Sequence, residues 1–348
     1  MPSPLNTSLL TMLCAILLAA CQPAPQEYRT TLLSFGTLID ISFWGVDKDQ
    51  AETVIKEVET DLKYMHYAWH AWQPGPIGRI NSLLQTTGTF SANPSVLGPI
   101  SRARELAIAS DHLFNPAISQ LIKLWGFHDD QPHGPPPSAE QIKQLLAQNP
   151  RMDDISIDAV RMQSKNPHVR LDLGGVAKGY GVEQIITLLQ NRGIHNAIVN
   201  AGGDLKAIGR HGDRPWTVGI RDPNNRKGVL ASLEVNDGES VFTSGSYERY
   251  YDYEGKRYHH IIDPRTGYPA EGTLSVTVIH RDATIADAAA TALLVAGPKD
   301  WQRIARQMGI EAVLLVDDKN NIYITPPMQA RVSFVTQPAN LIVRAVNE

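Results

Sequence analysis

The order of hydrophobic and polar positions predicts both strands and helices along the chain. Residues 37–43 (TLIDISF) alternate apolar and polar side chains, which is typical of a strand with one buried face. Residues 48–65 place apolar side chains at Val54, Ile55, Val58 and Leu62, which is the spacing of one helical face. The two periods occur side by side from the start of the chain.

The same reading extends over the rest of the sequence. Short helices are expected at residues 102–109, 118–124 and 139–148, and longer ones from the glycine pair after residue 173 to 189, at 284–296 and at 301–308. Strands are expected at residues 171–173, 197–200 and 274–279, in a meander at 216–220, 230–235 and 240–243, and in hairpins at 250–262 and 313–325. Antiparallel strands interspersed with helices favour an α+β fold in one domain, residues 32–348.

The N-terminus has a different pattern. Residues 9–20 (LLTMLCAILLAA) form an apolar run too short to span a bilayer, and small residues precede Cys21. This arrangement resembles a bacterial lipoprotein leader, although residues 1–8 contain no Lys or Arg. We expect a signal peptide at 1–20, lipidation of Cys21 and a tether at 21–31. An ordinary secretion signal with an incidental cysteine is the alternative.

Composition narrows the chemistry. The chain has 43% hydrophobic and 20% charged residues, a net charge of −4 and a pI of about 6.3, so nothing indicates nucleic-acid binding. Its two cysteines, Cys14 and Cys21, both lie in the leader. The domain that follows therefore has no disulfide, thiolate metal site or catalytic thiol. Its chemistry must use oxygen and nitrogen.

Two glycine turns are candidates for anion binding. In DLGGVAKGY, residues 172–180, glycines at a strand-to-helix turn expose backbone N–H groups, and Lys178 lies where it can reach a phosphate. This is not a P-loop, because Lys178 precedes Gly179. The AGGD turn at 201–204 offers a second set of N–H groups. Simple chain geometry, with Asp204 capping its own backbone, is the alternative for these turns.

Two further segments carry polar side chains. In ADAAAT, residues 286–291, Asp287 and Thr291 share one helix face and offer hard oxygens that suit Mg²⁺; a helix-dipole role for Asp287 is the alternative. In HHIIDPRTGYP, residues 259–269, a histidine can take a proton, Asp263 can orient it and Arg265 can face phosphate oxygens. The alternative there is a solvated hairpin end.

Taken together and in this order, these segments resemble the ApbE family, the flavin transferases once called thiamine-biosynthesis lipoproteins. The resemblance runs from about residue 35 to 326 and includes Gly36-Thr37, LWGF at 124–127, DLGGVAKGY, AGGD, TSGSYER at 243–249, HHIIDPRTGYP and ADAAAT. It implies a T-fold-like α+β architecture, with antiparallel sheets, flanking helices and FAD in a cleft between two lobes. It also implies an Mg²⁺-dependent enzyme that cleaves FAD, releases AMP and attaches FMN through a phosphodiester to a threonine of a partner flavoprotein.

The resemblance also assigns residues. His260 becomes the candidate base, with Asp263 as its orienter or as the alternative base. The metal site corresponds to the Gly175 carbonyl, Asp287 and Thr291. Positions that contact FAD correspond to Phe35, Trp72, Leu113, Phe114, Asn115, Asp172, Lys178 and Ile262.

Several positions depart from the family pattern. Phe35 stands where the family usually has Met, and the Ser-Glu usual before Asn81 is missing. The family's Phe-Asp-Pro-Thr reads Phe114-Asn115-Pro116-Ala117, and Ala290 stands where some members carry a second acid. These changes bear on the adenine side of the pocket and on the metal site.

Three functional hypotheses remain open at this point. The first is FMN transfer to acceptor flavoprotein subunits of membrane electron-transfer complexes, at the periplasmic side of a bacterial membrane. The second is an FAD pyrophosphatase that yields FMN and AMP. The third is a non-catalytic flavin-binding lipoprotein.

Overall fold

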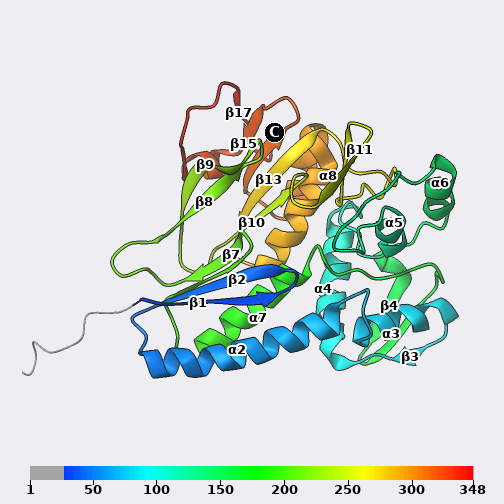
Figure 1. Cartoon of the computed structure of the whole chain (residues 1–348), viewed down its shortest axis with the longest axis horizontal. Helices are drawn as coiled ribbons and strands as arrows, with labels where there is room; N and C mark the ends of the chain where they lie inside the picture. The colour runs from blue at the N-terminus through cyan, green and yellow to red at the C-terminus, as the bar shows by residue number, and fades with distance from the viewer. Residues whose placement is uncertain (1–26, 348) are drawn as a thin grey trace, which may run out of the picture.

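A nine-stranded sheet forms the centre of the molecule. The computed structural model describes residues 27–347, so Cys21 and most of the expected tether lie outside it. Figure 1 shows the sheet between helices and a smaller sheet. Its strands, in spatial order, are β1 (Glu27–Ser34), β2 (Thr37–Trp44), β6 (Ala197–Ala201), β7 (Asp204–Ile208), β10 (Ser240–Gly245), β13 (Thr273–His280), β14 (Ala312–Asp317), β15 (Ile322–Ile324) and β17 (Leu341–Val343). Neighbours are antiparallel except β15 and β17, which are parallel.

Helices cover one face of this sheet. The alternation predicted for residues 37–43 is confirmed, because Ile39, Ile41 and Phe43 are at most 1% exposed. They pack into the main core with α2 (Lys48–Trp69), α4 (Pro94–Ala109), α7 (Ala177–Asn191) and α8 (Ala283–Gln307). The opposite face packs against a three-stranded sheet of β8 (Trp216–Asp222), β9 (Asn225–Val235) and β16 (Val332–Phe334). The short helix α9 (Pro326–Gln329) lies between β15 and β16 in the chain.

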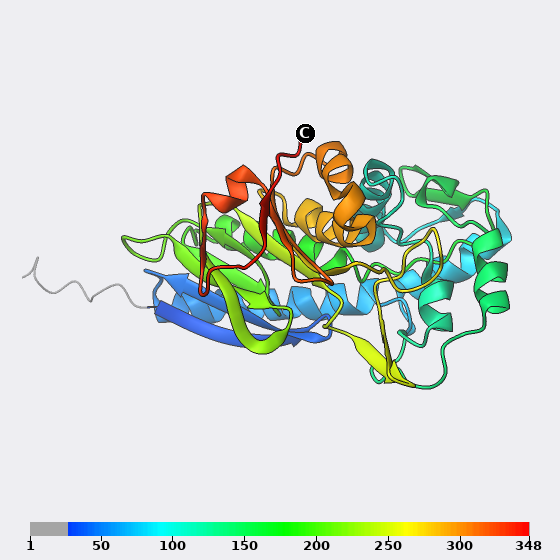
Figure 2. The same cartoon turned by 90° about the horizontal axis from the view of Figure 1, so that it is seen from above.

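A second lobe lies at the far end from the β8–β9 hairpin in both views (Figures 1 and 2). It contains α3 (Pro76–Leu83), η1 (Leu84–Thr86), β3 (Phe90–Ser91), α5 (Ser119–Leu124), α6 (Ala139–Ala147), η2 (Met152–Asp154), β4 (Ile155–Asp158) and β5 (Arg161–Ser164). A hairpin of β11 (Tyr250–Tyr253) and β12 (Lys256–His259) joins it to the main lobe through a third apolar cluster. The α+β class with antiparallel sheets and flanking helices is thus confirmed.

Three local predictions are wrong. The tether ends sooner than expected, because residues 27–34 alternate side chains and pair with β2. The meander is broken, since β10 pairs with β7 and β13 rather than with β9. Residues 171–173 form no strand, because Asn81 and Pro116 accept their N–H groups. The predicted break at Gly297-Pro298 is confirmed, because Gly297, at φ 71°, is not helical and α8 consists of two helical segments that meet there. Within residues 27–347, no helix has the length and apolar character needed to cross a bilayer.

Candidate active site

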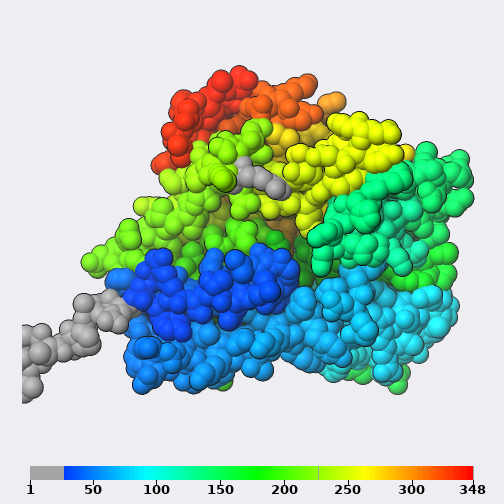
Figure 3. All heavy atoms as spheres, in the orientation of Figure 1, coloured from blue at the N-terminus to red at the C-terminus, as the bar shows by residue number. Residues whose placement is uncertain are grey.

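The predicted motifs meet at one edge of the nine-stranded sheet. The turn 201–204 joins β6 to β7 there, β10 ends there at Gly245, and α7 begins there after the glycine turn. The first turns of α8 pack against α7 beside them. Figure 3 shows the surface hollowed between the blue N-terminal hairpin, the yellow segment around residue 250 and the blue-green second lobe. Segments far apart in sequence thus supply one cleft.

Lys178 forms an ion pair with the carboxylate of Asp204. The other oxygen of this buried carboxylate accepts the backbone N–H of Thr243 at 2.8 Å. Asp204 therefore links β7 to α7 and β10, and the alternative of a cap on its own turn is not what the structure has. Burial disfavours a charged Lys178, but the Asp204 and Asp287 carboxylates outweigh it and raise the pKa of this lysine. The first turn of α7 therefore carries a lysine that stays protonated.

Asp287 and Thr291 lie one turn apart on α8, facing the start of α7. Asp287 Oδ2 accepts the N–H of Gly179 at 2.8 Å, and Thr291 Oγ1 lies 3.0 Å from Ser244 Oγ. A methyl group built on Gly175 would lie 3.9 Å from Thr291 Oγ1, so the Gly175 backbone borders this hydroxyl. The three proposed metal ligands therefore gather in one place.

The donor set fits Mg²⁺ rather than a softer metal. One carboxylate, one hydroxyl and one carbonyl are hard oxygens, and Mg²⁺ commonly takes only one or two carboxylates besides substrate phosphates. No group of three or more His, Cys, Asp and Glu side chains within residues 27–347 is arranged to hold a metal. Burial raises the pKa of Asp287, with Lys178 opposing that rise and Asp204 adding to it. A cation bound beside Asp287 would relieve this repulsion.

His260 has a defined tautomer. Its Nδ1 lies 3.2 Å from the carbonyl oxygen of Arg249, and a carbonyl can only accept, so Nδ1 carries the proton. Nε2 then has a free lone pair. Burial, together with the nearby Arg249 and His259, lowers the pKa of His260 to about 3. The ring is neutral at physiological pH and presents Nε2 as an acceptor of a proton.

Asp263 and Arg265 bond to each other and do not take the roles that the sequence predicted for them. Asp263 does not orient the ring; its two oxygens accept the backbone and side-chain N–H groups of Arg265, at 2.8–3.2 Å. Arg265 also donates to the Val295 carbonyl, so its guanidinium bonds to protein groups on both sides. The two-residue spacing makes this local ion pair easy to form. His259 is buried, and its Nε2 donates to Ala270 O at 2.7 Å.

The candidate FAD positions fall into two groups. The first group borders the cleft. Asp172 Oδ1 accepts the N–H of Gly174 at 2.9 Å, and the Trp72 side chain also bonds to the Asp172 carboxylate. Burial raises the pKa of Asp172, although these two bonds and the charge of Arg249 act to lower it. Phe35, at the tip of the β1–β2 hairpin, lies parallel to the Trp69 ring with 5.8 Å between centroids. This aromatic stack is suited to a flat ligand ring.

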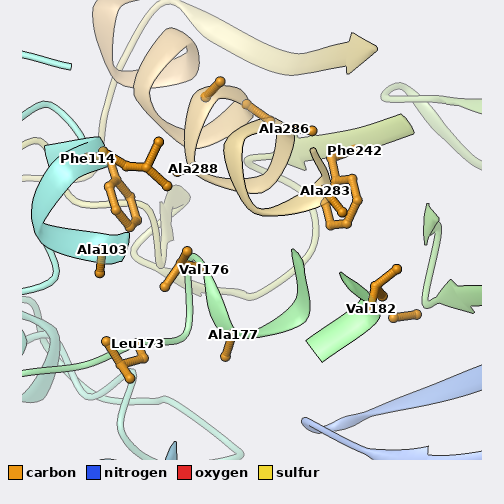
Figure 4. Close-up of a cluster of buried hydrophobic side chains, with 14 of the residues drawn as sticks. Ala103, Phe114, Leu173, Val176, Ala177, Val182, Phe242, Ala283, Ala286 and Ala288 are labelled. Carbon is orange, nitrogen blue, oxygen red and sulfur yellow. The ribbon is translucent and has the colours of Figure 1, made fainter. Parts of the chain in front are cut away.

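The second group is buried within the protein. Leu113, Phe114 and Ile262 are 3–4% exposed. Figure 4 shows Phe114 beside Ala288 of α8, in the core behind the glycine turn. The Asn115 amide donates to Pro150 O at 3.0 Å and accepts from Ala117 N at 3.1 Å. The Asn115 side chain thus makes one donated and one accepted bond within the protein.

Sequence reasoning missed Ser244 and Arg249. Ser244 bonds to Thr291, and Arg249 orients His260. Both lie in the segment TSGSYER, which the sequence marked as a motif without indicating which side chain faced the cleft. The signal was present, but only the fold shows which partners these residues meet.

Comparisons with known proteins agree with this geometry. The model of the ApbE family matches residues 35–314. An FAD:protein FMN transferase of Rhodobacter capsulatus is 42% identical over 313 residues, which cover 90% of this chain and 60% of that protein. One from Treponema pallidum (strain Nichols) is 31% identical over 333 residues, covering 89% of this chain and 90% of that protein.

Solved structures give the same result. The ApbE protein of Thermotoga maritima is similar with a TM-score of 0.80 and 32% identity, covering 90% of this chain and all of that one. The apo form of the Pseudomonas stutzeri flavinyl transferase ApbE is similar with a TM-score of 0.73 and 30% identity, covering 84% of this chain and 91% of that one.

The relatives and the solved structures that this chain resembles are flavin transferases or ApbE proteins. The chain belongs to the ApbE family. It spans only 60% of the Rhodobacter capsulatus protein, so nothing is carried over from the remainder of that protein.

Proposed function

We propose that this chain transfers FMN from FAD to a threonine hydroxyl of a target flavoprotein in a Mg²⁺-dependent reaction that releases AMP. The observation that carries the proposal is the neutral His260 ring, whose Nε2 lone pair is free because Nδ1 faces a carbonyl. A base of this kind is needed because a threonine hydroxyl hardly ionises at neutral pH. A hydrolase would need the same base, so the acceptor has to be established by experiment.

The proposed step balances as a single displacement. The threonine Oγ attacks the phosphorus of the FMN half of FAD while its proton passes to His260 Nε2. The bond from this phosphorus to the bridging oxygen breaks, and AMP leaves with that oxygen. Lys178, which stays protonated beside Asp204, stabilises the charge that develops on the phosphate oxygens.

Each remaining residue supports binding. The Gly175 carbonyl, Asp287 and Thr291 would hold Mg²⁺, which supplies charge neutralisation at the diphosphate. Asp172, Phe35 and Trp72 border the space for FAD. Leu113, Phe114, Asn115 and Ile262 form the packed wall behind it.

The location is part of the proposal. Cys21 would carry the lipid and hold the enzyme at the periplasmic side of a bacterial membrane. The acceptors would then be flavoprotein subunits of membrane electron-transfer complexes, reached on the same side. The apolar run before Cys21 and the small residues at the expected cleavage point support this location.

One experiment separates the three functional hypotheses. The protein is incubated with FAD, Mg²⁺ and candidate acceptor subunits, and AMP, free FMN and fluorescent protein bands are measured. AMP together with a fluorescent acceptor, whose labelled peptide contains a modified threonine, supports transfer. AMP with free FMN alone points to a pyrophosphatase. FAD binding without AMP points to a carrier and contradicts the proposal.

A further inference from the structure

One carbonyl oxygen fixes both the backbone and the ring of His260. The oxygen of Arg249 accepts the His260 backbone N–H at 3.0 Å and lies 3.2 Å from its Nδ1. These bonds set the ring's rotation and its tautomer together. The direction of Nε2 in the cleft therefore depends on where the main chain of Arg249 lies.

The side chain of Arg249 determines that position. Its Nη2 donates to the carbonyl oxygens of Phe127 at 2.9 Å and Asp129 at 3.1 Å. Both belong to the second lobe, in the segment between α5 and α6. The Phe127 ring in turn meets the His260 ring edge-on, with 6.3 Å between centroids. The guanidinium thus ties the start of the β11–β12 hairpin to the opposite wall of the cleft.

We propose that Arg249 is a positioning residue for His260, which joins the two lobes and thereby aims Nε2 at the acceptor hydroxyl. This inference rests on the proposed function. The sequence suggested Arg265 as the cation of this region, but that guanidinium bonds to Asp263 and to the Val295 carbonyl. Arg249 is exposed just before the β11–β12 hairpin, yet its guanidinium bonds to Phe127 and Asp129 both cross to the second lobe.

The positive charge of Arg249 also affects the pKa of His260, so the pH dependence of transfer gives a second measurement of this contact. Burial, Arg249, His259 and Lys178 all lower the pKa of His260, and only the bond to the Arg249 carbonyl raises it. Removing the guanidinium should therefore raise this pKa. Because the base acts when neutral, the acid limb of the transfer rate should move to higher pH.

The test compares three variants of the full chain. Arg249→Met keeps the length of the side chain without its donors, and Arg249→Lys keeps one charged donor. Arg257→Met is the matched control, because Arg257 lies on the same hairpin, stacks 3.7 Å over the Tyr250 ring and pairs with Asp252. FAD affinity, Mg²⁺-dependent AMP release and labelling of an acceptor that the unmodified enzyme labels are measured.

Arg249→Met should lower kcat for transfer about tenfold, which is less than the roughly 10²–10⁴-fold that a base contributes, because the ring remains present. FAD affinity should change little, Arg249→Lys should recover part of the rate, and Arg257→Met should match the unmodified enzyme. In a His260→Ala background, Arg249→Met should cost almost nothing further, since residues that act through one group are not additive.

Two results would overturn the inference: full transfer by Arg249→Met, or an equal loss from this change with and without His260. A purely structural role would produce the second result, because it would lower activity whether or not the base is present. If the unmodified enzyme labels no acceptor, the proposed function fails. If the enzyme labels its acceptor and Arg249→Met does so equally well, only the role of Arg249 fails.

Discussion

The carboxylate of Asp287 accepts a hydrogen bond from the backbone N–H of Gly179, with 2.8 Å between the two atoms. The two helices can approach this closely because residue 179 has no side chain; a methyl group there would lie 2.7 Å from Asp287 Cβ. The contact places a carboxylate, 5% exposed, beside the Lys178–Asp204 ion pair. Two acids and one lysine share this buried space, so one negative charge is in excess.

This excess charge predicts that Asp287→Asn stabilises the metal-free protein. An amide oxygen can still accept the Gly179 N–H, and the three side chains at Lys178, Asp204 and residue 287 then carry no net charge. Because burial raises the pKa of Asp287, its unfavourable contribution is absent at low pH and grows as pH rises through the folded-state pKa. At pH 8 without Mg²⁺, we expect the variant's Tm to be higher by roughly a few degrees. Added Mg²⁺ should stabilise the unmodified protein and leave the variant unchanged.

Asp282→Asn is the matched control on the same helix. Asp282 caps α8 through Ile285 N at 3.0 Å and pairs with Arg102 at 2.8 Å. Although burial opposes it, these partners lower the pKa of Asp282, so this variant should be less stable at neutral pH and lose that difference as pH falls. A destabilising Asp287→Asn would contradict the argument from excess charge. A variant that Mg²⁺ still stabilises would contradict the metal site.

His260→Ala should reduce FMN transfer by roughly 10²–10⁴-fold while FAD affinity changes little, because a base contributes in the transition state. His259→Ala should do the reverse. The buried His259 accepts the Ile261 N–H and donates to Ala270 O, so its loss should cost about 1–3 kcal/mol of stability and leave the rate of the folded enzyme intact. Tm and single-turnover transfer are measured for both.

The pH profile checks the same assignment. Since the pKa of His260 is held at about 3, the ring stays neutral through the usual assay range. In the free, Mg²⁺-saturated enzyme, kcat/KM should therefore show no acid limb near pH 6.5 from this group. An acid limb at that pH which disappears in His260→Ala would show that the ring is less shielded than its contacts indicate.

Local pattern predicted much of the fold. Alternation located β2, helical spacing located α2, and Glu254-Gly255 located the turn of the β11–β12 hairpin. These features depend on neighbours in sequence. The resemblance to one family also indicated the order of the site segments, and the structure brings Lys178, Asp287 and Thr291 to one edge of the sheet.

Contacts between residues that lie far apart in the sequence could not be predicted from local pattern. Asp204 meets Lys178 because α7 crosses β7, and Asp263 turns to Arg265 because that bond is available within two residues. Each outcome depends on which surfaces meet, and periodicity carries no information about that.

The lipid anchor remains a prediction, since Cys21 lies outside the described residues. Cys21→Ala should release the protein from the membrane fraction into the periplasm, because a lipid-modified cysteine is the anchor that the leader pattern predicts. Fractionation and the intact mass of the N-terminal peptide measure this. Secretion of an unmodified, soluble protein with Cys21 in place would show an ordinary signal peptide instead.

Glu183 is expected to hold the active-site helices in place. Its Oε1 accepts Lys206 Nζ at 2.7 Å and the N–H of Ala283, at the start of α8, at 2.5 Å. Lys206 also donates to Arg281 O at 2.6 Å, and its side chain is 9% exposed. The Glu183–Lys206 pair and the Lys178–Asp204 pair both link α7 to β7, but the lysine lies on β7 in the first and on α7 in the second. We expect the bond from Ala283 to Glu183 to hold the first turn of α8, which precedes Asp287.

Glu183→Gln leaves Lys206 buried without a counter-charge, so it should cost about 3 kcal/mol of stability. Below the new Tm, the variant should bind FAD normally but need more Mg²⁺ for half-maximal activity, because Asp287 moves relative to Thr291. Adding Lys206→Met should restore most of the stability, since the pair is then removed together. Glu57→Gln, which breaks an exposed pair with Arg192 elsewhere on α7, should change neither property. Equal effects from Glu183→Gln and Glu57→Gln would mean that the buried pair does not position the metal site.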